Sequence, residues 1–220
     1  MARLSDYKAK RDFSRTAEPR GRVVKTKSQR FIIQRHDATR LHYDFRLELD
    51  GVYKSWAVTK VPSLDPATKR LAVEVEDHPL DYGTFEGTIP KGEYGGGTVQ
   101  LWDRGTWKSQ SSAAPLRDLE NGQLKIELKG KRLKGGWALV RLRERDKRPS
   151  ATRNNWLLIK EKDAQAKPGD PDSLLAEDTS VKSGRTLEDI AAHSRSVWHS
   201  NKAARISGVK KKPRSQHAAQ

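Results

Sequence analysis

The sequence predicts a mainly β protein: a small closed antiparallel β-barrel with a basic N-terminal arm and a short C-terminal helix plus tail. Between residue 31 and about residue 160, short segments alternate apolar and polar side chains; they include VYKSWAV, LAVEVE, GTVQLW, QLKIEL, GWALVRL and NWLLIK. Gly, Pro, Asn or Asp separates most of these segments, which is typical of strands joined by turns. A chain of 220 residues is long enough for one such core with extensions.

Polar segments flank this predicted barrel on both sides. Residues 1–30 are rich in Lys, Arg, Ser and Thr, which predicts a basic arm that orders only against another surface. We assign the barrel domain to residues 31–163. Residues 164–220 are expected to form a polar linker, a helix from Thr186 to about His193 opened by a Thr186-x-x-Asp189 capping pattern, and a disordered basic tail ending in KKKPRSQHAAQ.

The composition points to a polyanionic partner. The formal net charge is +16, and nucleic acid is the leading candidate, although a merely solubilising basic surface is the alternative. The chain has no cysteine, which excludes disulfides, thiolate metal sites and cysteine nucleophiles. The N-terminus lacks an apolar signal region, and no uncharged segment approaches the roughly 18 residues of a membrane span. We therefore expect a soluble protein with no membrane partner.

The segment RLHYDFRLELDG, residues 40–51, has one apolar and one ionisable face. Leu41, Tyr43, Phe45, Leu47 and Leu49 fall on odd positions, whereas His42, Asp44, Arg46, Glu48 and Asp50 fall on even ones. Successive side chains of a strand point to opposite faces, so the pattern predicts a strand with a charged front. Asp50-Gly51 predicts a hairpin turn after it.

The ionisable face offers metal ligands. His36, His42 and Asp44 form a nitrogen, nitrogen and oxygen set that suits Mn, Fe or Zn. His42, Asp44 and His78 satisfy the H-x-D…H pattern of non-haem iron oxygenases equally well, so spacing alone leaves the ligand set open. The alternative is an ordinary strand face that is exposed to solvent and binds no metal.

A second predicted strand, at residues 71–78, also alternates apolar and ionisable side chains. Leu71, Val73 and Val75 are expected to point one way and Glu74, Glu76 and His78 the other, which predicts a polar pocket between two strands. Arg46 lies on the same face as Asp44, with Lys60 and Arg70 near the ends of flanking strands. A divalent cation beside fixed guanidinium groups is suited to binding phosphate.

Three weaker signals are interpreted as structural. PKGEYGGGT, residues 90–98, lacks the Gly-Lys-Ser/Thr ending of a P-loop and is expected to be a tight turn between strands. Lys160-Glu161-Lys162-Asp163 faintly resembles a nucleotidyltransferase lysine motif, but no Gly follows, and we interpret it as surface charge. Most of the six tryptophans lie in strand-like segments, which favours core packing over base stacking.

Longer segments resemble a known family. QRHDATRLHYDFRLELDGVYKSWAV, PSLDP, KRLAVEVEDHPLDYGTFEGTIPKGEYGGGTVQLWDRGTW and NWLLIKEKD are similar to the 3'-phosphoesterase module of bacterial DNA ligase D. The likeness covers nearly all of residues 31–163, and SVKSGRTLEDIA resembles the segment that follows that module. It implies a manganese-dependent β-barrel enzyme that removes a 3'-terminal ribonucleoside and a 3'-phosphate, leaving a 3'-OH in the repair of DNA breaks.

The resemblance also assigns roles to residues. It places His36, His42 and Asp44 on the metal, and Arg46, His78 and Tyr82 around the scissile phosphate. Gln34, Lys60, Arg70 and Glu76 take supporting places, and KRDF and TAEP imply that Arg11, Asp12 and Glu18 fold over the site. The implied partners are DNA 3' ends in primer-templates, with a DNA ligase, a polymerase or a Ku-type end-binding protein beside them.

Two features depart from the family pattern. Thr59-Lys60-Val61 replaces the usual Pro-Lys-Gly turn, which changes the backbone freedom around Lys60. Ligase and polymerase domains are missing beside the module, and the initiating Met1 with a basic tail favours a stand-alone, monomeric enzyme in a bacterial or archaeal cytoplasm, associated with the nucleoid. The alternatives are a non-catalytic nucleic-acid-binding barrel and the iron oxygenase.

Overall fold

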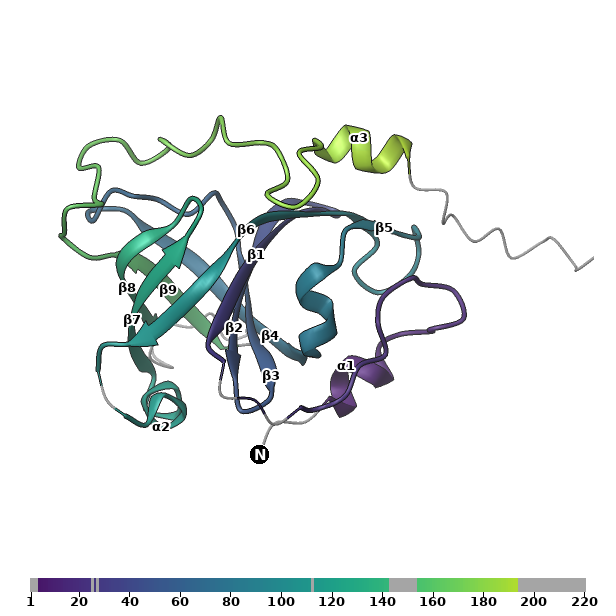
Figure 1. Ribbon diagram of the computed structural model, residues 1–220, viewed down its shortest axis with the longest axis horizontal. Coiled ribbons are helices and arrows are strands. Elements are labelled where there is room, and N and C mark those ends of the chain that lie inside the picture. The colour runs from purple at the N-terminus through teal and green to yellow at the C-terminus, as the bar shows by residue number, and fades with distance from the viewer. Residues whose placement is uncertain (1–3, 25, 27, 112, 143–153, 194–220) are drawn as a thin grey trace, which may run out of the picture.

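The computed structural model describes residues 4–24, 26, 28–111, 113–142 and 154–193 (Figure 1). From the N-terminus the elements are α1 (Ser5–Ala9), β1 (Arg30–Asp37), β2 (Leu41–Leu49), β3 (Val52–Val58), β4 (Lys69–His78), the 3-10 helix η1 (Leu80–Thr84), β5 (Gly87–Ile89), β6 (Gly97–Ser109), α2 (Pro115–Glu120), β7 (Gln123–Gly130), β8 (Lys134–Arg141), β9 (Asn155–Lys160) and α3 (Leu187–Ala192). The basic C-terminal tract KKKPRSQHAAQ lies outside the described residues, and within them no helix has the length and apolarity that a membrane crossing requires.

Eight antiparallel strands close into a ring. The order is β1-β2-β3-β4-β9-β8-β7-β6, and β6 pairs back onto β1. β5 lies outside the ring and pairs with β6 alone. The predicted closed antiparallel barrel is therefore confirmed. Asp50 and Gly51 join β2 to β3 with φ angles of 54° and 79°, the positive values that a tight hairpin turn requires.

The apolar face of each strand fills the barrel. Tyr43, Phe45 and Leu47 of β2 are buried there, as the alternation predicts. They pack with five buried tryptophans, which are Trp56, Trp102, Trp107, Trp137 and Trp156. Aromatic side chains bury large areas and dominate the packing energy of a core, so the tryptophans hold the barrel together.

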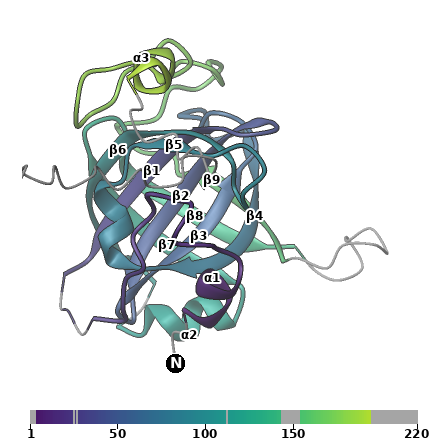
Figure 2. The same ribbon diagram turned by 90° about the vertical axis from the view of Figure 1, so that its right-hand side faces the viewer.

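The outer face of β1 to β3 is buried as well. η1 lies against it, and α1 with the rest of the arm lies beside η1 (Figures 1 and 2). Gly83 allows η1 to approach closely, because a Cβ there would lie 2.5 Å from the hydroxyl oxygen of Tyr53. Tyr7 of α1 is fully buried and donates to the carbonyl of Pro19 at 2.6 Å. The ionisable strand face therefore lies under a cover and not in solvent.

A β-bulge changes the predicted pattern of β4. Ser55 of β3 pairs with Val75 whereas Tyr53 pairs with His78, so β4 has one residue more than β3 over this stretch. Val75 consequently shares the outer face with Ser55, and Glu74 turns to the barrel side, where it accepts a hydrogen bond from Trp156 Nε1 at 2.9 Å. The expectation that Glu74 shares a face with His78 was wrong.

The polar segment after β9 crosses one end of the barrel and leads to α3 (Figure 1). Arg70 of β4 holds this segment by donating to the carbonyl of Pro171 and the carboxylate of Asp172 at 2.9 and 2.7 Å. The segment ends at Thr186, whose side chain accepts from the backbone of Asp189 while Asp189 accepts in return. The predicted capping box and helix are confirmed.

Lys160 is buried and not a surface charge. Its side chain is fully excluded from solvent, and Nζ donates to Asp163 Oδ2 at 2.6 Å and to the carbonyl of Gly136 at 3.0 Å. Asp163 also accepts the backbone N–H of Gly136. The interpretation of this motif as surface charge is wrong for Lys160, whose buried ammonium pairs with the partly exposed Asp163 and joins the end of β9 to β8; Lys162 and Asp163 lie at the surface, as expected.

We expect Asp163→Ala to lower the free energy of unfolding by about 2 kcal/mol, because the buried Lys160 ammonium loses its carboxylate and keeps only carbonyl acceptors. Urea denaturation followed by tryptophan fluorescence measures this change. Asp170→Ala, at an exposed turn position, is the matched control and should shift the value by less than about 0.5 kcal/mol. Equal losses in the two variants would mean that Asp163 does not stabilise the buried Lys160 ammonium.

Candidate functional site

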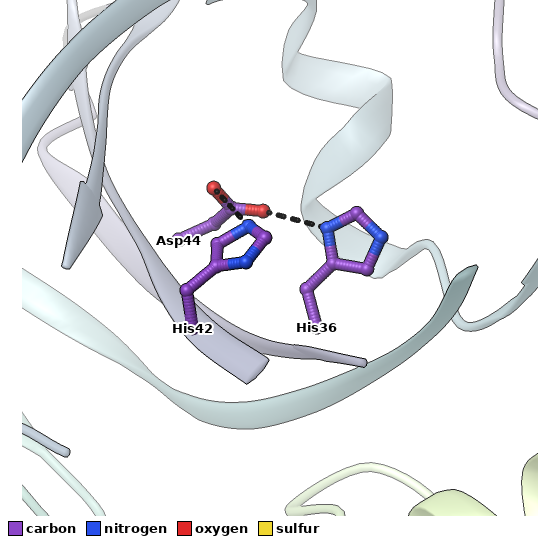
Figure 3. Close-up of side chains that lie close together, drawn as sticks. All are labelled: His36, His42 and Asp44. Carbon is purple, nitrogen blue, oxygen red and sulfur yellow. Dashed lines mark ion pairs between the residues drawn. The ribbon is translucent and has the colours of Figure 1, made fainter. Parts of the chain in front are cut away.

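A cluster of metal-ligating side chains lies on the outer face of β1 and β2. His36 and His42 are cross-strand partners, and Gln34 and Asp44 form the next pair on the same face, two residues further along each strand. Asp44 lies between the two imidazoles, 3.5 Å from His36 Nδ1 and 3.6 Å from His42 Nε2 (Figure 3). Ligand atoms of the three residues all lie within 4.8 Å of one another. The spacing argument had left two ligand sets open, and the structure brings together His36, His42 and Asp44.

The donor set fits a divalent transition metal. The carbonyl of Arg40 lies 2.9 Å from His42 Nδ1, and because a carbonyl only accepts, the imidazole proton resides on Nδ1 and Nε2 keeps its lone pair. His36 Nε2 is buried without a hydrogen-bond partner in the described part of the chain. Two imidazoles and one carboxylate are the mixed nitrogen and oxygen ligands that Mn, Fe and Zn accept.

Arg46 ties this cluster to a cation-rich neighbourhood. Its Nη2 lies 3.2 Å from Asp44 Oδ2, and both side chains are largely buried. Burial alone would raise the pKa of the Asp44 carboxyl, but the charge of Arg46 and a hydrogen bond from His36 outweigh it and hold that pKa well below its usual range. Asp44 is therefore a carboxylate at neutral pH, as a metal ligand must be.

Three neighbours fix the Arg46 guanidinium. Nε donates to Gln34 Oε1 at 3.0 Å and Nη1 to Ser55 Oγ at 2.9 Å. The guanidinium carbon lies 5.0 Å from the ring centre of Tyr82, within cation–π range. Gln34 in turn donates to the carbonyls of Tyr82 and Phe85 and so fastens η1 to the sheet. Arg46 is thus held in one orientation, which a phosphate-binding group requires.

His78 is a neutral imidazole with a defined tautomer. Its Nδ1 lies 2.8 Å from the carbonyl of Glu76, which only accepts, and its Nε2 lies 3.2 Å from Arg11 Nη2, which only donates. The proton therefore resides on Nδ1, and Nε2 is an acceptor. Burial, with Arg46 and Arg11 nearby, holds the pKa of His78 well below its ordinary value.

The N-terminal arm completes the site. Arg11 donates through Nε to Glu18 Oε1 at 2.8 Å and through Nη1 to Glu76 Oε1 at 3.1 Å. Tyr82 donates its hydroxyl to Glu18 at 3.1 Å, and burial keeps the pKa of that hydroxyl well above its usual range. Hydrogen bonds from Lys10 and Arg11 outweigh burial and lower the pKa of Glu76 to about 2. Arm, η1 and β4 are therefore joined by one network of charges.

These groups surround a cavity of about 300 Å³. Its lining includes the three cluster residues, Arg11, Arg46, Glu76, His78 and Tyr82. Tyr94 also lines it and donates to Glu76 at 3.2 Å. Tyr94 belongs to the segment 90–98, whose predicted turn is confirmed between β5 and β6, but no local pattern indicates that this turn reaches the site. Lys10, Tyr7 and Ser55 were also missed, because nothing in the local sequence indicates that they contact the site.

Three predicted site residues lie elsewhere in the described structure. Arg70 faces the C-terminal segment and also donates to the carbonyl of Val61, so the expectation that it flanks the pocket is corrected. Lys60 is exposed in the bend after β3 and does not line the cavity. Asp12 is exposed and accepts from Ser14 within its own turn. The alternative triad with His78 does not form, because its ring nitrogens face Glu76 and Arg11.

Residues 34–141 match the family model described as the DNA Ligase D 3'-phosphoesterase domain. The chain is 51% identical over 187 residues to the multifunctional non-homologous end joining protein LigD of Pseudomonas aeruginosa, which covers 80% of this chain and 21% of that protein. It is 40% identical over 187 residues to the LigD of Mycolicibacterium smegmatis, covering 81% and 23%. The chain thus spans about a fifth of the length of these curated relatives.

A divalent transition metal ion should bind the native protein through the His36, His42 and Asp44 cluster. We expect a Mn²⁺ titration to raise the thermal unfolding midpoint, because a ligand that binds only the folded state stabilises it, by about 2.7 kcal/mol at a hundredfold excess over Kd. His42→Ala should abolish the shift, whereas His193→Ala, at the end of α3, should preserve it. A full shift in His42→Ala would remove His42 from the ligand set.

His78 should make stability depend on pH near neutrality. Its folded pKa lies below the ordinary value of 6.5, so the unfolded chain binds a proton first as pH falls, and stability decreases below about pH 6.5. From pH 7.5 to pH 5.5, the protein should lose about 1 kcal/mol more than His78→Gln does. Urea unfolding at the two pH values measures the difference. Equal losses would mean that His78 titrates normally.

Proposed function

The chain belongs to the family of DNA ligase D 3'-phosphoesterase domains, and from this premise we propose that it is a metal-dependent enzyme that heals the 3' ends of DNA. One observation carries the proposal: Arg46 lies 3.2 Å from Asp44, so that a fixed guanidinium and a metal-ligand set share one cavity. A divalent cation beside a guanidinium is complementary to a phosphoryl group and to the charge that develops on it.

The proposed substrates are DNA strands that end in a ribonucleoside or a 3'-phosphate. Release of the terminal ribonucleoside breaks a phosphodiester and leaves the phosphate on the strand. A second hydrolysis breaks the bond between phosphorus and the 3'-oxygen and leaves the 3'-OH that a polymerase or ligase uses. Water supplies the new oxygen on phosphorus in both steps, so one site for a phosphate at a strand end serves both.

His36, His42 and Asp44 are proposed to hold the metal, with Mn²⁺ as the preferred ion. When bound, it supplies a Lewis acid that polarises a phosphoryl oxygen and lowers the pKa of water. The protein prepares this role by fixing the His42 tautomer through Arg40 and by keeping Asp44 ionised through Arg46.

Arg46 is proposed to bind the phosphate oxygens. Three of the five N–H groups of its guanidinium are engaged by Gln34, Ser55 and Asp44, which orients the remaining ones. Tyr82 supports the guanidinium from below, and its hydroxyl keeps its proton and remains a donor. Gln34 and Glu76 are positioning residues, because they act through Arg46 and Arg11.

His78 is proposed to move protons. Its neutral ring presents an acceptor at Nε2, so it takes a proton from the attacking water, while the leaving sugar oxygen, on the opposite side of phosphorus, takes its proton from solvent. His78 cannot begin the reaction as a general acid at Nε2, because the proton of its neutral ring resides on Nδ1. Arg11 now donates to Nε2, and it must turn toward the phosphate for His78 to act, so the arm closes the charge network on the substrate.

We further propose that the enzyme works in non-homologous end joining. The relatives carry this process in their names, and the basic charge of this chain fits a DNA substrate. A DNA ligase, a polymerase or a Ku-type end-binding protein would act on the same ends after the 3'-OH is formed.

The test is conversion of a primer-template with a single 3'-ribonucleotide or a 3'-phosphate. With Mn²⁺ we expect a 3'-OH product from both substrates, and none with chelator or with His42→Ala. Tight DNA binding without conversion would indicate the non-catalytic barrel. Conversion that requires oxygen would indicate the oxygenase.

Arg46→Gln should lower kcat at least about a hundredfold, because removing one group that stabilises transition-state charge typically costs about 3 kcal/mol or more. Arg117→Gln, an exposed arginine on α2, is the matched control and should leave kcat unchanged. Activity of Arg46→Gln within about threefold of the native protein would reduce Arg46 to a structural residue.

A further inference from the structure

A second hollow lies on the other side of η1. It has a volume of about 410 Å³, with Ile32 and Leu80 in its floor and Arg30, Arg104 and Lys131 around it. No acidic residue belongs to its lining. Arg30 is partly neutralised by Glu48 at 2.6 Å, whereas no ion pair within the described part of the chain holds Arg104 or Lys131. We call this hollow the basic groove.

The groove and the catalytic cavity are laid out along one strand. On the outer face of β1, Arg30 and Ile32 line the groove, Gln34 binds Arg46, and His36 belongs to the metal cluster. η1 forms the wall between the two hollows, because Tyr82 lines the cavity while Leu80 and Gly83 line the groove. A strand rises about 3.3 Å per residue, so Arg30 lies about 20 Å from His36 along β1.

The Lys131 ammonium donates to the carbonyl of Val181 at 3.3 Å, and backbone hydrogen bonds hold the turn that carries it. Lys131 belongs to the turn between β7 and β8, and buried Asp103 accepts the backbone N–H groups of Lys131, Arg132 and Leu133 at 2.8 to 3.1 Å. Arg104 is next to Asp103 in β6 and is exposed. Lys131 also lines a third hollow of about 560 Å³ with Lys134 and Lys167, and there Arg132 is paired with Glu177 at 2.9 Å. Lys134 and Lys167 therefore extend the positive surface beyond the groove, and Arg132 does not.

We propose that the basic groove binds the phosphodiester backbone of the DNA whose 3' end occupies the catalytic cavity. Successive phosphates of one strand are about 3.4 Å apart along the helix axis, so about 20 Å corresponds to about six nucleotides from the 3' end. The cations meet phosphates and the apolar floor meets sugars, without reading bases. The proposal rests on the proposed function for the position of the 3' end.

The test compares affinity for short and long DNA in two charge-matched variants. Arg104→Gln/Lys131→Gln removes two groove cations, and Arg117→Gln/Lys125→Gln removes two exposed cations that line neither hollow. The probes are fluorescent DNA hairpins with a 3'-OH end, closed by an uncharged linker, with stems of about four and about twelve base pairs. Anisotropy titrations over a range of salt concentration give Kd and its salt dependence without any turnover.

On the long stem, the groove variant should bind about tenfold more weakly than the control variant, and the slope of log Kd against log salt should fall by about two. On the short stem, which ends before the groove, the two variants should bind equally. Arg104→Gln alone should lower the slope by about one, which keeps the test valid if Lys131→Gln disturbs the fold.

Equal losses on both stems, or none on either, would overturn the proposal. Unchanged DNA binding with weaker binding of polyglutamate would overturn it too, and would assign the groove to an acidic protein. The proposed chemistry is judged separately, by release of phosphate from 3'-phosphate ends. A length-dependent loss of binding without any phosphate release would support the groove and reject the chemistry.

Discussion

The buried ion pair between Asp44 and Arg46 is the constraint on which the site depends. Two charges withdrawn from water on one strand face are costly unless every remaining donor and acceptor is satisfied. Gln34 and Ser55 each accept one N–H of Arg46, and His36 and His42 flank Asp44. The apolar side chains on the opposite face of the same strand pack in the barrel core and fix the backbone. The aromatic core therefore positions the charged side chains without contacting them.

The charges around the cavity balance one another. Asp44, Glu76 and Glu18 are matched by Arg46, Arg11 and Lys10, while His78 is neutral. In the proposed reaction, the positive charge of a divalent metal ion held by His36, His42 and Asp44 would be offset by the negative charge of the phosphate ester. The arm supplies half of this balance, which explains why a basic, otherwise polar segment folds against the barrel.

Local alternation predicted the fold and placed His42 and Asp44 on one face, whereas the choice of His36 over His78 as their partner came from the resemblance. β2 has no bulge, so period two placed His42, Asp44 and Arg46 correctly, and only the resemblance singled out Arg11 and Glu18. Alternation failed at β4, where one extra residue turns Glu74 to the barrel side. Arg70 and Lys160 were misplaced because a long cationic side chain gives no local sign that a carbonyl or carboxylate distant in sequence will bury it. Tyr94 was missed because its partners lie in the arm and in β4.

η1 divides the outer face into two environments with different chemistry. On one side, carboxylates, imidazoles and guanidiniums neutralise one another and leave a cavity suited to a metal ion and a phosphate. On the other side, Arg104 and Lys131 have no acidic counterpart in the groove lining. Where the charges of the protein balance, as in the cavity, individual groups can be directed at a metal ion and a phosphate. Where positive charge is unbalanced, as in the groove, it attracts a phosphate chain whatever its base sequence. Because β1 passes beneath both, the spacing between chemistry and recognition is set by a strand in a closed barrel, and a strand in a closed barrel cannot shift without breaking the ring.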